Sequence, residues 1–150
     1  MPCAGRHVTS ISVAAEEQYD RAVALKPGIS RESEFVVEDR LLTDVGGTIG
    51  VAVLSTPGMI AMIERNAAIL AAEHLPDGSG TVGFEICVKH VAGAGEGALC
   101  TASATLREIV DGRKLRFDVE VREGDRPIGV GTHERRVINI GEHAARAASG

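Results

Sequence analysis

The sequence is poor in aromatic residues: its 150 positions hold no tryptophan, one tyrosine and three phenylalanines. Any core must therefore be built mainly from aliphatic side chains. Basic residues are not in excess either, because 16 lysines and arginines stand against 21 aspartates and glutamates. The net charge of -5 argues against a nucleic-acid partner, which a basic surface normally contacts. No apolar run is long enough to cross a membrane and no signal-peptide core is visible, so we expect a cytoplasmic protein without a membrane partner.

Cysteines are few and widely spaced. Cys3, Cys87 and Cys100 are odd in number, which favours free thiols in a reducing compartment over a disulfide framework. No cysteine pair has the spacing of zinc ligands and the five histidines are scattered, so we predict no metal site. The glycines match no phosphate-binding or dinucleotide fingerprint. The sequence therefore predicts no resident cofactor.

One long apolar segment dominates the first half of the chain. The dipeptide Thr56-Pro57 offers a hydroxyl at the N-cap and a proline at the first helical position, and we expect a helix from there to about Leu75. Pro76 and the turn residues after it end the helix. A strand is expected before it, over 30–38.

After the helix the apolar period changes from that of a helix to that of a strand. Four further strands are expected, over 81–91, 98–109, 114–122 and 127–140, with tight turns such as Asp111-Gly112 between them. This order predicts an α+β fold, an antiparallel sheet of about five strands wrapped around one long central helix, as in the hot-dog fold. Because one sheet cannot cover so apolar a helix on all sides, we expect a homodimer, with a dimer of dimers as a further option.

The chain has the length of a single domain. We expect this domain to span residues 28–141. Residues 1–27 are expected to form an N-terminal extension, either disordered or a short helix, and residues 142–150 a C-terminal tail.

Glu64 interrupts the apolar helix. Its neighbours on a helical wheel of about 100° per residue are apolar: Ile60, Ala68, Ala71 and Leu75. A polar stripe lies on the other side: Arg65, Asn66 and Glu73. A buried carboxylate must be paired, hydrogen-bonded or protonated. Three interpretations are open: a structural ion pair, a rotated helix that leaves Glu64 at a groove, and a catalytic carboxylate.

His90 ends the first strand after the helix. It shares one face of that strand with apolar residues, and this face should meet the helix: Val82, Phe84, Ile86 and Val88. A lone histidine on such a face is usually a satisfied core residue. Because the helix also directs Glu64 inward, the two side chains can instead form a general acid–base pair in which the carboxylate orients the ring.

Thr56 and Gly83 each have a structural and a functional interpretation. In the structural interpretation, Thr56 is simply a helix cap. In the functional one, its hydroxyl is a nucleophile or positions a water at the positive end of the helix, where an oxyanion is favoured. Gly83 either breaks the strand alternation for packing or a bulge, or lets a substrate carbonyl approach its backbone amide.

The segment 131–138 is dense in charge for a strand. Alternation places His133 and Arg135 on one face and Glu134 and Arg136 on the other. The structural interpretation, which we favour for Arg136, is that one pair is solvated and the other forms a cross-strand ion pair.

Three motifs together resemble the fluoroacetyl-CoA thioesterase group of the hot-dog superfamily. The first is Thr56-Pro57-Gly58-Met59 with Glu64 eight residues after the threonine. The second is Gly83-Phe84-Glu85-Ile86-Cys87-Val88-Lys89-His90. The third is Gly131-Thr132-His133-Glu134-Arg135. They occur in this order at family-like distances, and the resemblance extends from about Gly28 to Ile140.

The resemblance implies a dimer that hydrolyses a small acyl-CoA, with no cofactor apart from the coenzyme A of the substrate. It implies Thr56, Glu64 and His90 as catalytic residues. Gly83 would offer an amide to the thioester carbonyl, and Arg135 would support the site by hydrogen bonding.

The sequence departs from the family before the threonine. Members carry a phenylalanine-rich lid there, whereas this chain has Gly50 at the position of an aromatic lid residue. We therefore expect a thioesterase without fluoroacetyl specificity. One alternative is a hot-dog module that binds acyl-CoA or another small ligand without turnover. A second is a hydratase or dehydratase, whose Asp/His motif is not found. A third is a structural dimer with Glu64 and His90 paired in its core.

Overall fold

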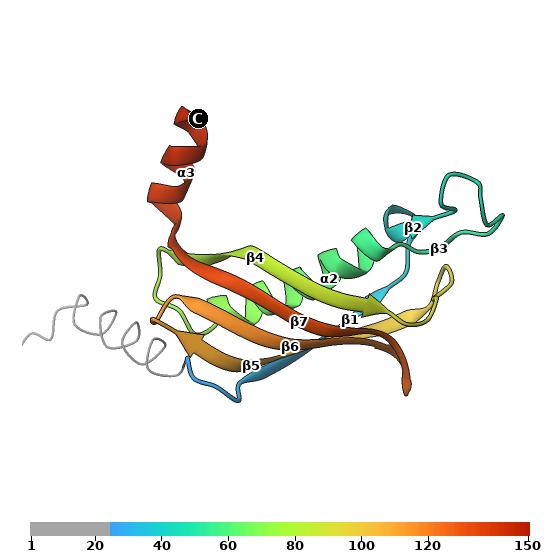
Figure 1. Ribbon diagram of the computed structural model, residues 1–150, viewed down its shortest axis with the longest axis horizontal. Helices are drawn as coiled ribbons and strands as arrows, with labels where there is room; N and C mark the ends of the chain where they lie inside the picture. The colour runs from blue at the N-terminus through green and yellow to red at the C-terminus, as the bar shows by residue number, and fades with distance from the viewer. Residues whose placement is uncertain (1–24) are drawn as a thin grey trace, which may run out of the picture.

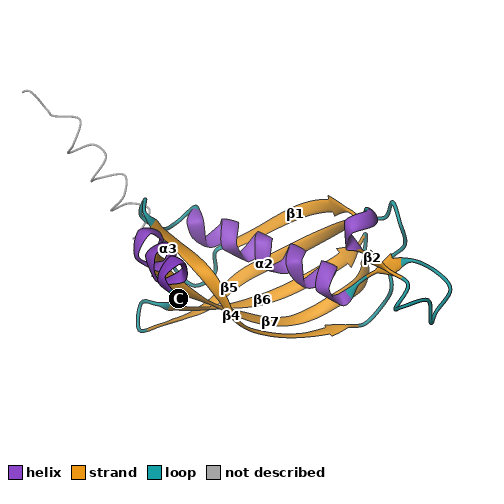
Figure 2. Cartoon of the chain, turned by 90° about the horizontal axis from the view of Figure 1, so that it is seen from above, coloured by secondary structure: helices purple, strands orange, loops and turns teal. Residues whose placement is uncertain are grey.

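A five-stranded antiparallel sheet curls around one helix in the computed structural model, which describes residues 25–150 (Figure 1). The strands follow the order β1-β5-β6-β7-β4 across the sheet. Their bounds are β1 Ser30–Val36, β4 Ser79–His90, β5 Leu99–Val110, β6 Lys114–Glu123 and β7 Arg126–Asn139. Helix α2, Thr56–Ala72, lies along one face of the sheet, as Figure 2 shows. The predicted α+β architecture is confirmed.

Four short elements were not predicted. They are the 3-10 helix η1 (Asp39–Leu41), the two-residue strands β2 (Leu42–Thr43) and β3 (Val53–Leu54), and helix α3 (Ile140–Ser149). Helix α3 takes the place of the expected tail and projects away from the sheet without a buried residue (Figure 1). The expectation of a disordered or helical N-terminal extension falls largely on residues 1–24, outside the part of the chain that the structure describes. Within residues 25–150, no helix is both long and apolar enough to cross a membrane.

The alternation of β6 builds the floor of the core. Leu115, Phe117 and Val121 are fully buried against α2, while the charged residues between them point to the opposite face. The turn that precedes the strand has φ of 55° at Asp111 and 62° at Gly112. Both residues lie in the left-handed region, as a two-residue hairpin turn with the sequence Asp-Gly requires. These features confirm the predicted hairpin.

The ends of α2 differ from the prediction by one to three residues. Ser55, rather than Thr56, is the N-cap, since its Oγ accepts a hydrogen bond from the Gly58 amide at 2.9 Å. Thr56 is the first helical residue, and its hydroxyl is thereby free for another partner. The helix ends at Ala72 instead of Leu75.

Helix α2 is rotated relative to the wheel drawn from its sequence. Asn66, expected on the exposed stripe, is only 1% exposed. Its Oδ1 accepts a hydrogen bond from Ser33 Oγ at 2.6 Å, and its Nδ2 donates one to the Arg31 carbonyl at 3.0 Å. The predicted position of Glu64 in the middle of the buried face is wrong, because its side chain is 43% exposed. The second interpretation of Glu64, a rotated helix with the carboxylate at a groove, describes the structure.

A β-bulge interrupts β4 between Gly83 and Glu85. The extra residue changes the face on which the following side chains lie. Phe84 was expected to face the helix, but it is 60% exposed and lies under the guanidinium of Arg136, whose Cζ is 3.6 Å from the ring centroid. The bulge keeps Gly83 on the inner face opposite Arg135, and Ile86 on the inner face opposite His133.

Replacing Asn66 with alanine should test the anchor that fixes the rotation of α2. The change leaves Ser33 Oγ and the Arg31 carbonyl without their partner, and we expect the free energy of unfolding to fall by about 1–3 kcal/mol in chemical denaturation. Arg65→Ala on the exposed neighbouring position is the matched control and should change stability by less than about 0.5 kcal/mol. Equal effects of the two substitutions would contradict the anchoring role.

Candidate active site

Thr56 and His90 form the first of two clusters. The hydroxyl Oγ1 of Thr56, in the first turn of α2, lies 2.9 Å from Nδ1 of His90 at the end of β4. Nε2 of His90 is buried and has no hydrogen-bond partner among residues 25–150. A hydroxyl beside an imidazole nitrogen is the geometry in which histidine activates a nucleophile or a bound water.

Glu64 and Gly83 form the second cluster. The Glu64 carboxylate lies so close to Gly83 that a Cβ on this residue would overlap Oε1. Only glycine therefore leaves space for the carboxylate at this point of β4. The expected contact between Glu64 and His90 is not formed, because no ion pair joins these two side chains within the described part of the chain. The charged partners of Glu64 come from β7 instead: Arg135 Nη1 at 3.8 Å and His133 Nε2 at 3.9 Å from Oε1.

Arg135 is held in place by three hydrogen bonds. Its Nε donates to Thr81 Oγ1 at 2.7 Å, its Nη2 to the Thr81 carbonyl at 2.9 Å, and its Nη1 lies 3.1 Å from His133 Nε2. The residue is 6% exposed. The hydrogen bonds of Arg135 go to Thr81 and His133, and the supporting role that the family resemblance implied stays a prediction. Arg135 reaches Glu64 only through its charge.

Burial governs the titration of both basic neighbours of Glu64, His133 and Arg135. It lowers the pKa of His133, and the positive charge of Arg135 acts in the same direction against the opposing effects of the Glu85 carbonyl and Glu64. Burial also lowers the pKa of Arg135, which nevertheless keeps the charge of an arginine at neutral pH. The carboxylate of Glu64 therefore faces one full positive charge and one neutral imidazole.

The two clusters lie apart within one chain. Thr56 and Glu64 are eight residues apart on α2, which corresponds to about 12 Å along a helix axis. The structure thus brings Thr56 to His90 and Glu64 to Gly83 and Arg135, but does not join the two groups in one protomer. The alternation of 131–138 predicts that His133 shares the face of Arg135, but it predicts no role for His133.

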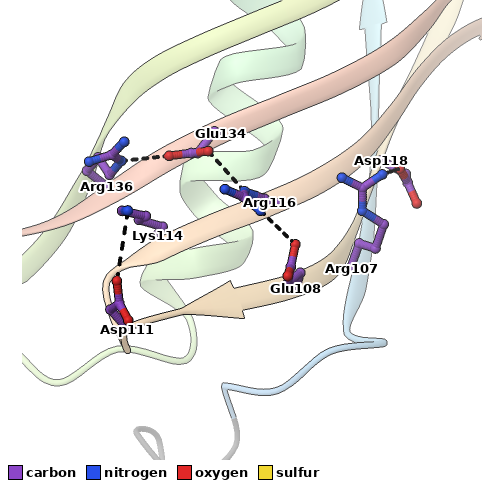
Figure 3. Close-up of polar contacts among 8 residues, drawn as sticks. All are labelled: Arg107, Glu108, Asp111, Lys114, Arg116, Asp118, Glu134 and Arg136. Atoms are coloured by element: carbon purple, nitrogen blue, oxygen red, sulfur yellow. Dashed lines mark hydrogen bonds and ion pairs between the residues drawn. The ribbon is translucent and has the colours of Figure 1, made fainter.

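A network of charges covers the opposite face of the sheet. Figure 3 shows Glu134 between Arg136 and Arg116, with α2 behind the strands. Nε of Arg136 and Nε of Arg116 lie 2.7 and 3.1 Å from the carboxylate of Glu134. Burial opposes ionisation of Glu134, but these hydrogen bonds lower the pKa of its carboxyl group. The predicted alternation of faces is confirmed, and Glu134 forms a cross-strand ion pair with Arg116. The expected solvated pair is wrong, because His133 and Arg135 on the other face are only 2% and 6% exposed.

Residues 25–150 contain no group of three or more histidine, cysteine, aspartate or glutamate side chains arranged to hold a metal ion. Cys87 and Cys100 are free thiols, and Cys3 lies outside the described residues.

The fold places the chain among proteins of the hot-dog class. A hot-dog-like protein from Thermanaerovibrio acidaminovorans shares the fold with a TM-score of 0.73 at 21% identity, over 82% of this chain and 90% of the other. A solved structure of the fluoroacetyl-CoA thioesterase FlK superposes with a TM-score of 0.75 at 30% identity, over 84% of this chain and 97% of that one.

Sequence comparison identifies the family. A family model described as fluoroacetyl-CoA-specific thioesterase matches residues 36–141. The fluoroacetyl-CoA thioesterase of Streptantibioticus cattleyicolor is 37% identical over 94 residues, which are 63% of this chain and 67% of that protein. The chain belongs to this thioesterase family and is a thioester hydrolase.

Gly83→Ala should displace Glu64 without disturbing the fold. Gly83 does not have a left-handed φ, and the only close obstacle to a Cβ is the mobile end of Glu64. Because displacing a catalytic group by about 1 Å can cost about 100-fold in rate, we expect a loss of that order in kcat with an unchanged melting temperature. Gly93→Ala, where a Cβ meets nothing within 4 Å, is the control. Full activity of Gly83→Ala would show that the position of Glu64 is unimportant.

Proposed function

We propose that this protein hydrolyses a small acyl-CoA thioester to the free acid and CoA, with Thr56, Glu64 and His90 as catalytic residues and Gly83 and Arg135 as substrate-binding residues. The observation that carries the proposal is the 2.9 Å contact between Thr56 Oγ1 and His90 Nδ1 at the N-terminal end of α2. Membership of a thioesterase family supplies the reaction class.

His90 supplies the proton transfers of this reaction. As Thr56, or a water that Thr56 positions, attacks the thioester carbonyl, Nδ1 of His90 takes the hydroxyl proton. The carbonyl oxygen becomes an oxyanion, which the amides at the start of α2 and of Gly83 stabilise. The C–S bond then breaks, and the CoA thiolate takes the proton from His90. If Thr56 itself attacks, a second water hydrolyses its acyl ester.

Glu64 is suited to act on water or on the acyl group. Its half-exposed carboxylate has no hydrogen bond within residues 25–150 and is held only by charge. It either takes a proton from the hydrolytic water or attacks the thioester carbonyl. In the second route the C–S bond breaks, CoA leaves as a thiolate that solvent protonates, and water opens the resulting anhydride. In single-turnover hydrolysis in H2(18)O, 18O in the carboxylate of Glu64 would establish the anhydride route with water attack at the Glu64 carbonyl, since direct hydrolysis labels the product acid alone.

We further propose a homodimer built on β4. This strand is an edge of the sheet and twelve residues long, so it presents unpaired backbone groups that another strand can bond. Two antiparallel copies of β4, related by a two-fold axis near Cys87, would set Gly83 opposite the partner subunit's His90. Such a dimer would complete each site with Thr56 and His90 from one subunit and Glu64 from the other.

The acyl group is small but is not selected by an aromatic lid. Gly50 has a φ of 69°, a conformation in which a phenylalanine would be strained. The relative named above acts, by its name, on fluoroacetyl-CoA. We propose that this chain accepts short acyl-CoAs without preference for the fluorinated group.

Release of free CoA thiol from a panel of short acyl-CoAs tests the function. Wild type should release thiol from at least one substrate, and Glu64→Gln and His90→Ala should each lower kcat by about 100-fold or more, because each removes a group that transfers a proton. Both variants should melt near the wild-type temperature. No release from any substrate, with CoA ester binding retained, would favour a module that binds without turnover. Variants that lose stability instead of rate would favour a structural role.

A further inference from the structure

His133 is buried beside the proposed site and has no part in the chemistry given above. It is 2% exposed in the inner strand β7. Its ring centroid lies 6.4 Å from that of Phe117 on β6, and its Cε1 lies 3.6 Å from the position of a Cβ on Gly83. The ring therefore forms the wall beneath Gly83 and Glu64. Its polar contacts show what it does there.

The two ring nitrogens of His133 have opposite roles. Nδ1 is 2.8 Å from the carbonyl oxygen of Glu85, which can only accept, so Nδ1 carries the proton. Nε2 is 3.1 Å from Arg135 Nη1, which can only donate, so Nε2 carries the lone pair. These two partners together require the neutral ring. Burial, which lowers the pKa of His133, favours the same state.

The hydrogen bond to His133 determines how Arg135 meets Glu64. Nη1 donates to the imidazole, while its distance to Glu64 Oε1 is 3.8 Å, beyond a hydrogen bond. The two bonds to Thr81 hold the remainder of the guanidinium. Glu64 consequently feels the positive charge but keeps its oxygens free for water or substrate.

We propose that His133 is a positioning residue of this thioesterase: as a neutral acceptor it fixes Arg135 beside Glu64 and prevents the guanidinium from capturing the carboxylate. The inference rests on the proposed role of Glu64. A side chain that offers Arg135 no buried hydrogen-bond acceptor at the position of Nε2 cannot perform this task.

Protonation of His133 should abolish this arrangement. The groups that face the ring are Glu64 from α2, Arg135 from its own strand, the backbone carbonyl of Glu85 from β4, and the apolar Phe117 from β6. A proton on Nε2 would remove the acceptor for Arg135 and create a donor that captures Glu64. Because the pKa of His133 is lowered from about 6.5, this loss should appear only in more acidic solution than that.

Two substitutions separate the contacts of the ring. The amide of His133→Gln reaches the position of Nε2, so it can accept from Arg135 and cannot titrate. The amide of His133→Asn reaches the position of Nδ1, so it can donate to the Glu85 carbonyl but offers Arg135 nothing. In the thiol-release assay at pH 7.5, with wild type as the reference, we expect Gln to keep most of the wild-type kcat. We expect Asn to lose about 10–100-fold in kcat, with a smaller change in KM.

The pH profile adds a readout that a packing role would not change. In a plot of kcat against pH, the acid limb of His133→Gln should depend on one protonation fewer than that of the wild type. If the wild type is active, two results would overturn the role of His133 and leave the proposed function intact. One is an equal kcat for the Asn and Gln variants, and the other is an unchanged acid limb in the Gln variant. An inactive wild type would instead overturn the proposed function.

Nitrogen NMR of the wild type keeps the inference testable if either variant fails to fold. The protein is labelled with 15N-histidine. The signals of His133 are assigned through their loss in a folded His133 variant or through correlation to neighbouring protons. At pH 7.5 we expect His133 to be the neutral Nδ1–H tautomer. An imidazolium or the Nε2–H tautomer would contradict the proposal, because neither can accept from Arg135.

Discussion

The rotation of α2 about its axis is the constraint on which the site depends. It is fixed by Asn66, which bridges Ser33 and the Arg31 carbonyl on β1 at one side of the sheet. Turning the helix to bury this amide carries Glu64 to the other side, toward β4 and β7. There the carboxylate meets Gly83 and lies near Arg135. The two hydrogen bonds of Asn66 at one edge thus determine where the proposed catalytic carboxylate lies at the other.

Two local features of the sheet make this position usable. The bulge in β4 keeps Gly83 on the inner face and turns Phe84 outward onto Arg136, so that no large side chain fills the space of Glu64. The alternation of β7 then places neighbouring charged or titratable residues of the segment 133–136 on opposite faces of the sheet. Arg135 and His133 face Glu64, while Glu134 and Arg136 stabilise the outer face of the sheet. The four consecutive residues from His133 to Arg136 therefore contribute to both the site and the fold.

The sequence predicts much of this architecture because periodicity reflects burial. The strands, the Asp111-Gly112 turn and the two faces of 131–138 follow from patterns of neighbouring residues. The rotation of α2 was missed because Asn66 is polar and a helical wheel counts it as exposed, whereas its burial depends on partners in β1. The outward position of Phe84 was missed because simple alternation does not include a bulge. Pairing of Glu64 with β7 rather than with His90 is a tertiary contact that no spacing within one segment contains.

The central claim is that the two clusters belong to one site only when two subunits meet. It is tested by purifying a heterodimer with differently tagged subunits, one carrying His90→Ala and the other Glu64→Gln. In the proposed dimer, one site of this pair receives both damaged residues and the other receives none, so we predict about half of the wild-type thioesterase activity. A heterodimer as inactive as the two parent homodimers would contradict the account and show that Thr56, His90 and Glu64 of the same subunit act together.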